Sequence, residues 1–469
     1  MTGAWLEPLP DAAQQQEIDR WAIEDQGLGQ QVLMEHAGIG LARVVERCAP
    51  SGRVVVVCGK GNNGGDGHVA ARALRETGRE VRVVRAFEEP FDPAGAEVIV
   101  DALLGTGFSG APRDPLDGVI AAINAAGVPV VAADMPSGVN GSTGEVEGVA
   151  VCATATATFH RAKPGLWVHP GKAHAGEVHV VDIGVPPGAP GDPAVGLIAP
   201  AVLRGLPGRA AASSKFSSGT VVVVGGSPGL TGAPIMAAHA AMRAGAGYVI
   251  IASGRANETT FAFRPVEAML RPVDTVDEAL EVIERADAVV LGPGLGRDGG
   301  AQAFARELYA RIEAPLVLDA DGLNAFALAD MPERPAPTVL TPHAGELGRL
   351  LGCESAEIGA HRLDCAREAA CRSGALVVLK GDDTLIAAPD GRVAVSPGGA
   401  PALATAGTGD VLSGVIAALL ARGAEPWHAA AAAVWAHVRA GQIAAHPHGP
   451  DGVVATDVIG ALRPAFGAG

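Results

Sequence analysis

The sequence predicts an α/β protein with two domains, each built around a mainly parallel β-sheet. The chain has 469 residues, which is more than one hydrophobic core usually supports. Short apolar runs alternate along it with segments whose apolar residues recur at helical spacing. Its 64 glycines, 34 prolines and 48% hydrophobic residues are typical of a globular enzyme with many loops. We therefore expect sheets assembled from β-α-β units.

The first series of elements predicts a domain over residues 1–195. Its expected strands are 54–58, 81–84, 97–100, 128–132 and 178–183. Helical spacing predicts helices over 67–77 and 116–126 between them. Residues 186–196 then hold four prolines and three glycines, a composition typical of an exposed connection between domains.

A second series predicts another α/β domain over residues 196–469. Alanine-rich helical segments separate its strands, which are expected at 220–224, 247–252, 288–292, 315–319, 338–341 and 375–379. Runs of valine and leucine in these segments are typical of strands that are buried on both faces of a parallel sheet.

Charge and cysteine content limit the setting in which the protein works. The formal net charge of −16 argues against binding to nucleic acid or to an acidic membrane surface. Its six cysteines form no C-x-x-C pair, so we expect reduced thiols and a cytoplasmic location. The first residues lack the basic and apolar regions of a secretion signal.

A glycine-rich stretch, CGKGNNGGDG, covers residues 58–67, at and beyond the end of the first strand. Ligands of open α/β sheets bind beyond the carboxyl ends of strands, where glycines let a phosphate approach the backbone. The stretch does not match the usual G-x-G-x-x-G dinucleotide pattern. Its Asn and Asp residues are alternatively simple turn formers.

Two further loops follow strands of the same domain, at residues 101–115 and 134–145. The three strand ends bring together Asn, Asp and Ser oxygens. Such oxygens suit a hard cation, and a set with few carboxylates suits a monovalent cation better than Mg²⁺.

These motifs together resemble the YjeF N-terminal domain, an NAD(P)H-hydrate epimerase with a Rossmann-like three-layer fold. The resemblance is carried by LMEHAG (33–38), NNGGDG (62–67), DALLGTG (101–107) and DMPSG (134–138). The first of these motifs has His36 where the family usually has asparagine.

The resemblance implies a site for the hydrated dinucleotide beside two glycine-rich segments. Its residues would be Asn62, Asn63, Gly64, Gly65, Asp66, Gly105, Thr106, Gly107, Phe108, Ser109, Gly110 and Ala111. Asn63, Asp101 and Ser137 would hold a potassium ion.

The same resemblance places Asp134 at the nicotinamide ring, where a carboxylate can move a proton as the hydroxyl-bearing carbon inverts. Lys163 is the candidate electrostatic partner of Asp134, and it is one of only five lysines beside thirty arginines. The alternatives are that Asp134 only caps its loop and that Lys163 has no catalytic role.

In the second half, ATAGTGDVLSG (404–414) carries the clearest signal. GTGD at the start of a predicted helix directs backbone N–H groups and the helix dipole toward an anion, with Asp410 as a possible base beside it. By contrast, GPGLG (292–296) and LDADG (318–322) are ordinary strand-to-helix turns when each is taken singly.

The second half resembles the ribokinase-like NAD(P)H-hydrate dehydratase family over residues 200–469. The resemblance is carried by TGAP (231–234), GPGLG, TPHAGE (341–346), LKGDDT (379–384) and GTGDVL (407–412). Both halves together imply a bifunctional repair enzyme that acts on NADHX and NADPHX. Its epimerase would interconvert the R and S hydrates, and its dehydratase would dehydrate the S form with ADP or ATP and Mg²⁺. A homo-oligomer is also expected.

By the same resemblance, Asp410 is the base that activates the ring hydroxyl. The substrate would contact Ala233, Gly294, Gly296, His343, Ala344, Gly345, Glu346, Arg349 and Asp410. The nucleotide would contact Lys380, Gly381, Asp382, Asp383, Thr384, Ala406, Gly407, Thr408 and Gly409. His343 could instead serve as a helix cap.

Two other functions fit parts of the sequence. GTGD also serves kinases of sugars or vitamin alcohols, which would leave a stable phosphorylated product. YjeF-like domains also occur as binding modules without catalysis, and such a module would not interconvert the two hydrates.

Overall fold

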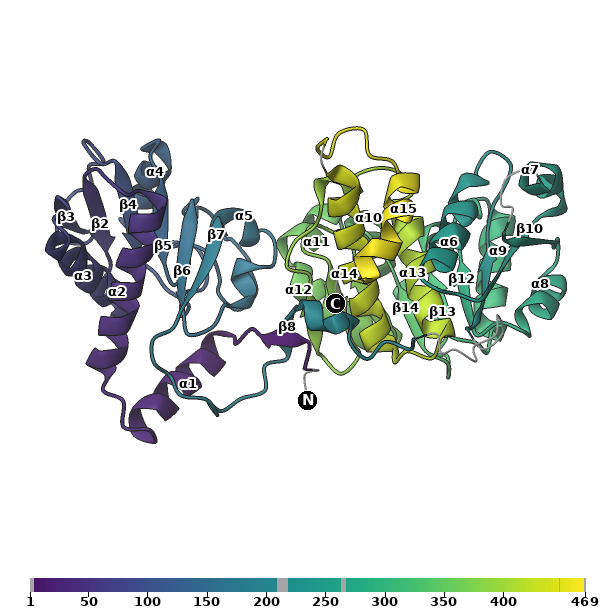
Figure 1. Ribbon diagram of the computed structural model, residues 1–469, viewed down its shortest axis with the longest axis horizontal. Coiled ribbons are helices and arrows are strands. Elements are labelled where there is room, and N and C mark those ends of the chain that lie inside the picture. The colour runs from purple at the N-terminus through teal and green to yellow at the C-terminus, as the bar shows by residue number, and fades with distance from the viewer. Residues whose placement is uncertain (1–3, 209–217, 263–266, 447, 468–469) are drawn as a thin grey trace. The chain divides into compact units, whose positions relative to one another are not determined.

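Two sheets organise the chain, one in each of two units. The computed structural model describes residues 4–208, 218–262, 267–446 and 448–467. Glu7–Leu197 form the first unit, and the second begins at Ile198 and also includes Ala4–Leu6. Figure 1 draws residues 7–197 in purple to blue and the residues from 198 onward in teal to yellow. In the described ranges, no helix is both long enough and apolar enough to cross a membrane.

The first unit contains a six-stranded parallel sheet in the order β3-β2-β4-β5-β6-β7. The strands are β2 (Val54–Cys58), β3 (Val81–Arg85), β4 (Val98–Ala102), β5 (Val130–Ala133), β6 (Ala155–Phe159) and β7 (Glu177–Val181). The helices are α1 (Ala12–Glu24), α2 (Gln30–Cys48), α3 (Asn62–Glu76), α4 (Leu116–Ala125), α5 (Lys172–Ala175) and the 3₁₀ turn η1 (Pro164–Leu166).

The valine run of β2 explains why this unit has three layers. Val54 and Val56 pack with α2 and α3, whereas Val55 and Val57 belong to the core on the α4 side. Successive side chains of a strand point to opposite faces, so a run of valines supplies both cores. The expected Rossmann-like three-layer architecture is confirmed.

One predicted element begins earlier than expected. The sequence predicted a helix from residue 67, but α3 begins at Asn62, so NNGGDG is the start of a helix and not a loop. Glycine is needed there for close packing. A Cβ at Gly64 would lie 2.1 Å from the Gly59 carbonyl oxygen, and one at Gly67 would lie 2.7 Å from the Cβ of Ala102.

The second unit contains most of an eleven-stranded sheet, whose order is β1-β8-β17-β16-β15-β14-β13-β12-β9-β10-β11. The strands are β1 (Leu6–Pro8), β8 (Val195–Ile198), β9 (Thr220–Val224), β10 (Tyr248–Ser253), β11 (Met269–Pro272), β12 (Ala288–Leu291), β13 (Leu316–Leu318), β14 (Thr338–Leu340), β15 (Leu376–Leu379), β16 (Leu385–Ala387) and β17 (Val393–Val395). The pairs from β11 through β15 are parallel, and β16 pairs antiparallel with both neighbours.

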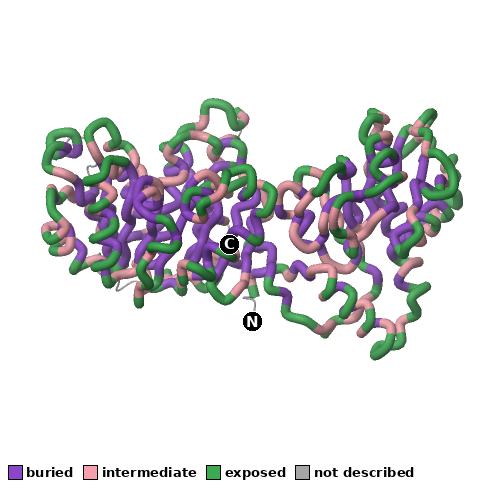
Figure 2. The backbone as a smooth tube through the Cα atoms, turned by 180° about the vertical axis from the view of Figure 1, so that it is seen from behind, coloured by how far each residue is buried: buried purple, intermediate pink, exposed green. Residues whose placement is uncertain are grey.

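Helices cover both faces of this sheet, and Figure 2 shows the buried backbone in the middle of each unit. The α-helices are α6 (Gly232–Arg243), α7 (Glu258–Ala262), α8 (Val276–Ile283), α9 (Gly299–Arg311), α10 (Ala344–Leu351), α11 (Ser355–Ala360), α12 (Arg362–Ser373), α13 (Thr408–Ala421), α14 (Pro426–Ala445) and α15 (Ala455–Phe466). The 3₁₀ turns are η2 (Pro200–Leu203), η3 (Arg255–Asn257), η4 (Ala320–Ala325), η5 (Leu328–Asp330) and η6 (Pro401–Leu403).

The close packing of α13 on α6 gives a testable pair of substitutions. A Cβ at Gly414 of α13 would lie 2.1 Å from the Ala237 carbonyl oxygen of α6, whereas one at Gly460 of α15 meets nothing within 4 Å among the described residues. We expect Gly414→Ala to destabilise the protein by about 1–3 kcal/mol through overpacking. Gly460→Ala should instead stabilise it by about 0.5–1 kcal/mol. Urea denaturation of both variants tests this, and equal stabilities would contradict the expected packing.

Two candidate active sites

A cavity of about 610 Å³ lies at the carboxyl ends of the strands in the first unit. The segments that follow β2, β4 and β5 line it on one side, and residues of α1 and α2 complete it. This is the edge at which open parallel sheets bind ligands.

Most of the sequence-predicted residues of the first site reach this cavity. The residues that line it are Asn62, Asn63, Asp66, Gly105, Thr106, Gly107, Phe108, Asp134 and Lys163. Gly64, Gly65, Ser109, Gly110 and Ala111 are not part of its lining. Gly65 has a packing role, because a Cβ there would lie 2.6 Å from the Cε of Met34.

Asp134 forms a buried ion pair at the floor of the cavity. Its Oδ1 accepts a hydrogen bond of 2.6 Å from the Lys163 ammonium, which is 1% exposed. Its Oδ2 accepts from the backbone N–H and the hydroxyl of Thr106, at 2.9 and 2.6 Å. Burial acts to raise the pKa of Asp134, but Lys163 and Thr106 outweigh burial and hold that pKa below its usual range. Asp134 is therefore ionised at neutral pH.

The backbone of Asp134 explains why this residue can turn toward the cavity. It has a φ of +62°, in the left-handed region that Asp and Asn tolerate better than most residues. The site thus depends on an unusual conformation at the end of β5.

A second carboxyl group in the cavity is held in the opposite state. Burial, reinforced by the charges of Asp134 and Asp19, raises the pKa of Asp66 to about 8. Burial also raises the pKa of Asp19, which accepts a hydrogen bond of 2.8 Å from Gln15 of the same helix. A protonated carboxyl and an ionised one in the same cavity form the arrangement that acid–base catalysis needs.

The sequence interpretation missed Asp19 and Gln15. Both lie on α1, which precedes β2, the first strand of the six-stranded sheet, and carries no glycine-rich motif. Their spacing of four residues on a helix was the only available signal, and such spacing is common on solvated helix faces.

The three residues expected to hold a cation lie close to one short segment, 103–104. Asp101 accepts from the backbone N–H of Leu103 and from both the N–H and the hydroxyl of Ser137. The Leu104 N–H donates to the Ser137 hydroxyl, and the Asn63 amide donates to the Leu104 carbonyl. The amide oxygen of Asn63 is buried and has no hydrogen-bond partner in the described ranges.

His36, the departure from the family motif, is not part of the cavity lining. Its Nδ1 lies 2.8 Å from the Ile183 carbonyl oxygen, beyond the end of β7. His36 therefore contacts the backbone of a residue that lines the cavity, without reaching the cavity itself.

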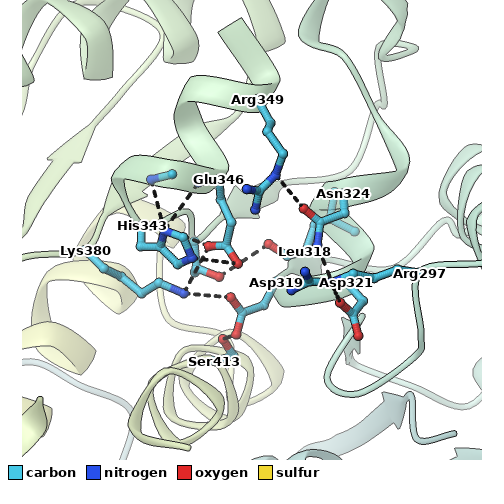
Figure 3. Close-up of polar contacts among 12 residues, drawn as sticks. Arg297, Leu318, Asp319, Asp321, Asn324, His343, Glu346, Arg349, Lys380 and Ser413 are labelled. Carbon is cyan, nitrogen blue, oxygen red and sulfur yellow. Dashed lines mark hydrogen bonds and ion pairs between the residues drawn. The ribbon is translucent and has the colours of Figure 1, made fainter. Parts of the chain in front are cut away.

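The second candidate site lies at the carboxyl ends of β13, β14 and β15 and at the start of α13 (Figure 3). Asp319, which follows β13, is 1% exposed. It accepts from the Lys380 ammonium at 2.9 Å and from the Ser413 hydroxyl at 2.6 Å. Burial acts to raise the pKa of Asp319, but Lys380 and Ser413 lower it below the usual range.

Asp410 is the third residue of α13, as the GTGD motif predicted. Burial, together with the charge of Asp319 and against that of Lys380, raises the pKa of Asp410 to about 7. Gly407, with a φ of +91°, turns the chain into the helix so that its first N–H groups are unpaired within the helix. A carboxyl that titrates near neutral pH beside free N–H donors suits a general base next to an anion.

His343 acts as a cap, which was one of the two roles considered for it. Its Nδ1 accepts from the backbone N–H groups of Gly345 and Glu346, and Glu346 accepts in return from the His343 N–H. This capping box fixes the start of α10. Ala344 and Gly345 form the first turn of the same helix.

Glycine loops and a carboxylate shape the opposite side of this site. Gly294 and Gly296 have φ angles of +62° and +99°. Asp321 accepts from the Gly296 N–H and from Arg297, and Arg349 donates to Asn324 at 2.9 Å (Figure 3). Ala233 lies in the first turn of α6.

The residues expected to contact the nucleotide fall into two groups. The first group follows β15 as a tight turn, in which the Thr384 hydroxyl donates to the Gly381 carbonyl and Asp382 accepts from the Gly399 N–H. Asp383 is turned inward and pairs with buried Arg362 at 2.9 Å. The second group, Ala406, Gly407, Thr408 and Gly409, forms the entry to α13.

The pKa of Asp410 predicts the pH dependence of the second site. A general base must be ionised to accept a proton, so kcat/KM should rise about tenfold per pH unit below a pKa near 7 and level off above it. A pH profile of the reaction in the second unit tests this. A rate that is constant from about pH 6 to 8 would contradict a base with a pKa near 7.

Two residues of the second site, Asp319 and Ser413, were missed at the sequence level. Asp319 lies within LDADG, which taken singly is an ordinary turn after a strand. An aspartate directly after a fully apolar strand was the available signal. Ser413 lies within the predicted helix, where a serine gives no indication of its partner.

Comparison with known proteins assigns both halves of the chain. A family model described as NAD(P)H-hydrate dehydratase matches residues 221–464, and one described as YjeF-related protein N-terminus matches 30–94 and 85–165. A Salinibacter ruber protein named bifunctional NAD(P)H-hydrate repair enzyme Nnr is 40% identical, over 96% of this chain and 95% of that protein.

Solved structures resemble the second half. An ADP/ATP-dependent NAD(P)H-hydrate dehydratase from Bacillus subtilis, co-crystallised with ATP/Mg²⁺, has a TM-score of 0.52 and 31% identity and covers 57% of this chain and 95% of its own. A ribokinase-like superfamily protein from Enterococcus faecalis has a TM-score of 0.52 and 28% identity, over 59% and 97% of the two chains. The expected ribokinase-like fold of the second half is confirmed.

Proposed function

Since this chain belongs to the family of bifunctional NAD(P)H-hydrate repair enzymes, we propose that its first unit interconverts the R and S hydrates and its second unit dehydrates the S form. The observation that carries the proposal is that each region matched by a family model also contains a candidate active site. Each matched region contains a carboxylate paired with a lysine at the carboxyl ends of its sheet, Asp134 with Lys163 and Asp319 with Lys380. The substrates would be NADHX and NADPHX.

In the first unit, Asp134 accepts and returns the proton of the ring hydroxyl, while Lys163 keeps it ionised. We infer that inversion proceeds through ring opening: the hydroxyl-bearing carbon loses its bond to the ring nitrogen and becomes a carbonyl carbon, and the nitrogen takes a proton from a donor. Reclosure on the other face of the carbonyl reverses both proton transfers. Asp66, with its raised pKa, is suited to that role. The backbone around Asn62 and Gly105 would contact the dinucleotide.

Asn63, Asp101 and Ser137 are proposed to hold a potassium ion. The unpartnered Asn63 oxygen supports this, because a buried acceptor without a donor is costly unless a cation or water satisfies it. A bound cation would supply positive charge near the dinucleotide phosphates.

Potassium dependence should appear in stability as well as in rate. Replacing K⁺ by choline should lower the Tm, since a ligand at a hundred times its Kd stabilises by about 2.7 kcal/mol. Asn63→Ala should lose this response. A wild-type Tm that does not change with K⁺ would contradict the cation site.

In the second unit, Asp410 takes the proton from the ring hydroxyl as that oxygen attacks the terminal phosphoryl group of the nucleotide. The bond between that phosphoryl group and the rest of the nucleotide breaks, and the shortened nucleotide leaves. The hydroxyl oxygen is now part of a phosphate, which leaves the ring carbon more readily than hydroxide does. The adjacent ring carbon gives up a proton to solvent as the ring regains its double bond. Mg²⁺, which was present with ATP when the Bacillus subtilis dehydratase was crystallised, would neutralise nucleotide charge. The entry to α13 would contact the phosphates through its N–H groups.

The kinase alternative is not favoured, because the dehydratase model matches most of the second unit.

The expected cytoplasmic location is supported by six cysteines that are all free thiols. The expected homo-oligomer stays a prediction.

The decisive test supplies mixed R and S hydrates of NADH with either ADP or ATP. Full recovery of NADH absorbance requires both activities, because the dehydratase alone would stop when the S form is used up. Recovery of the S fraction alone would contradict the epimerase, and a stable phosphorylated product would favour a kinase.

A further inference from the structure

Asp319 joins three separate segments of the second site through one buried carboxylate. Its Oδ1 is 2.9 Å from the Lys380 ammonium and its Oδ2 is 2.6 Å from the Ser413 hydroxyl. These partners come from the end of β15 and the second turn of α13 (Figure 3). Asp319 is 1% exposed, so it lies beneath the other residues of this cluster and not at the solvent-accessible side of the site.

The charge of Lys380 lies at the entry to α13. A Cβ on Gly409 would be 3.4 Å from the Lys380 Nζ, and Glu346 Oε2 is 3.7 Å from it. Burial acts to lower the pKa of Lys380, but Asp319 and Glu346 outweigh burial and raise it. The ammonium is therefore protonated and lies where the helix N-terminus also favours an anion.

A lysine at this place needs an anchor. Its ammonium is a point charge on a flexible four-carbon stem, unlike the rigid fork of arginine. Catalysis of phosphoryl transfer depends mostly on positioning and charge, so a small displacement of the ammonium costs rate. Of its two carboxylate contacts, that to Asp319 is the shorter, at 2.9 Å against 3.7 Å for Glu346.

We propose that Asp319 is a positioning residue of the dehydratase, which acts through Lys380 by holding its ammonium against the transferring phosphoryl group. The inference rests on the proposed function of the second unit. Asp319 exchanges no atom in the reaction: the hydroxyl proton goes to Asp410, and the phosphoryl group goes to the hydroxyl oxygen.

Asp319 could also act directly on Asp410 through its charge, and this role predicts a different effect of Asp319→Asn on the rate. The negative charge of Asp319 is one of the causes that raise the pKa of Asp410. If only this field mattered, Asp319→Asn would let Asp410 ionise at lower pH and would make the enzyme faster in mild acid. Loss of position instead predicts a slower enzyme at every pH.

A double-mutant cycle on the full-length protein separates these roles. We expect Asp319→Asn to lower the dehydration kcat on the order of 10²-fold, as misplacement of a catalytic group does, with little change in the nucleotide KM. Lys380→Met should lower it about 10²–10³-fold. Because Asp319 acts through Lys380, the double variant should be no slower than Lys380→Met. Losses that multiply, or a faster Asp319→Asn enzyme in mild acid, would overturn the proposal.

Asp287→Asn is the matched control. Asp287 directly precedes β12, at the amino ends of the strands of the same sheet, whereas the site lies at their carboxyl ends. Its side chain accepts from the Thr220 N–H at 2.7 Å. This variant should dehydrate at the wild-type rate. If the wild-type protein itself does not dehydrate the hydrate, the proposed function fails, whereas an active wild type with multiplying losses overturns only the role of Asp319.

Ser413→Ala provides a second route if Asp319→Asn does not fold. It removes the hydroxyl that donates to Asp319 Oδ2 and leaves both charges in place. We expect a smaller loss of kcat that disappears in the Lys380→Met background. No loss, or the same loss in both backgrounds, overturns the proposal.

Discussion

Asp410→Asn should lower the rate of dehydration about 10²–10⁴-fold, the usual cost of removing a positioned general base. The nucleotide KM should change little, because the N–H groups of Gly407, Thr408 and Gly409 remain when the carboxylate becomes an amide. Epimerisation should continue at the wild-type rate, since Asp134 and Lys163 belong to the other unit. The measurements are a dehydration assay on the S hydrate and a titration of nucleotide binding.

Asp457→Asn is the control for this prediction. Asp457 is the third residue of α15, as Asp410 is of α13, but it is exposed, and its side chain accepts from the Val454 N–H. It should have wild-type kinetics. If Asp410→Asn loses nucleotide binding together with activity, its role is to hold the entry of the helix instead of accepting a proton.

Asp134→Asn should lower epimerisation by a similar factor, about 10²–10⁴-fold, and leave dehydration of the pure S hydrate within a few-fold. Asparagine is the conservative replacement, because it tolerates the φ of +62° as aspartate does. Interconversion of the R and S hydrates, followed by chromatography, measures the effect. A parallel loss of both activities would mean that the two reactions depend on one site.

This substitution also has a cost in stability. It leaves the Lys163 ammonium, which is 1% exposed, beside a neutral partner, and breaking a buried ion pair in this way costs about 3–5 kcal/mol. The assay should therefore be accompanied by a Tm measurement. Asp117→Asn, at an exposed position in the first turn of α4, should change neither the Tm nor the rate.

The sequence was most informative where a residue pattern has one physical explanation. The run VVVVC supplies both faces of a parallel sheet, and the structure places all five residues in a buried strand. GTGD marked the start of α13, where Gly407 precedes the helix and Asp410 lies in its first turn. Such signals are local, so they survive without knowledge of the fold.

The sequence failed where the meaning of a residue depends on distant partners. NNGGDG has the composition of a loop, but it is helical because its glycines fit against Gly59 and Ala102. The strand β6, with the sequence ATATF, has too little apolar character to stand out, and β16 and β17 have only three residues each. Asp319 gains its importance from Lys380 and Ser413, which are 61 and 94 residues away.

The N-terminal residues Ala4–Leu6 belong to the second unit, and this has a consequence for synthesis on the ribosome. The Trp5 ring stacks on His428 at 5.5 Å and lies 6.3 Å from Trp427, and both partners are on α14. At about 5–20 residues per second, Trp5 emerges tens of seconds before α14 is made. While the first unit is synthesised, the Trp5 ring therefore has no α14 to pack against. A gene cut after Leu197 would leave Ala4–Leu6 on the first fragment, and the second fragment would lack Trp5, the ring that packs on Trp427 and His428.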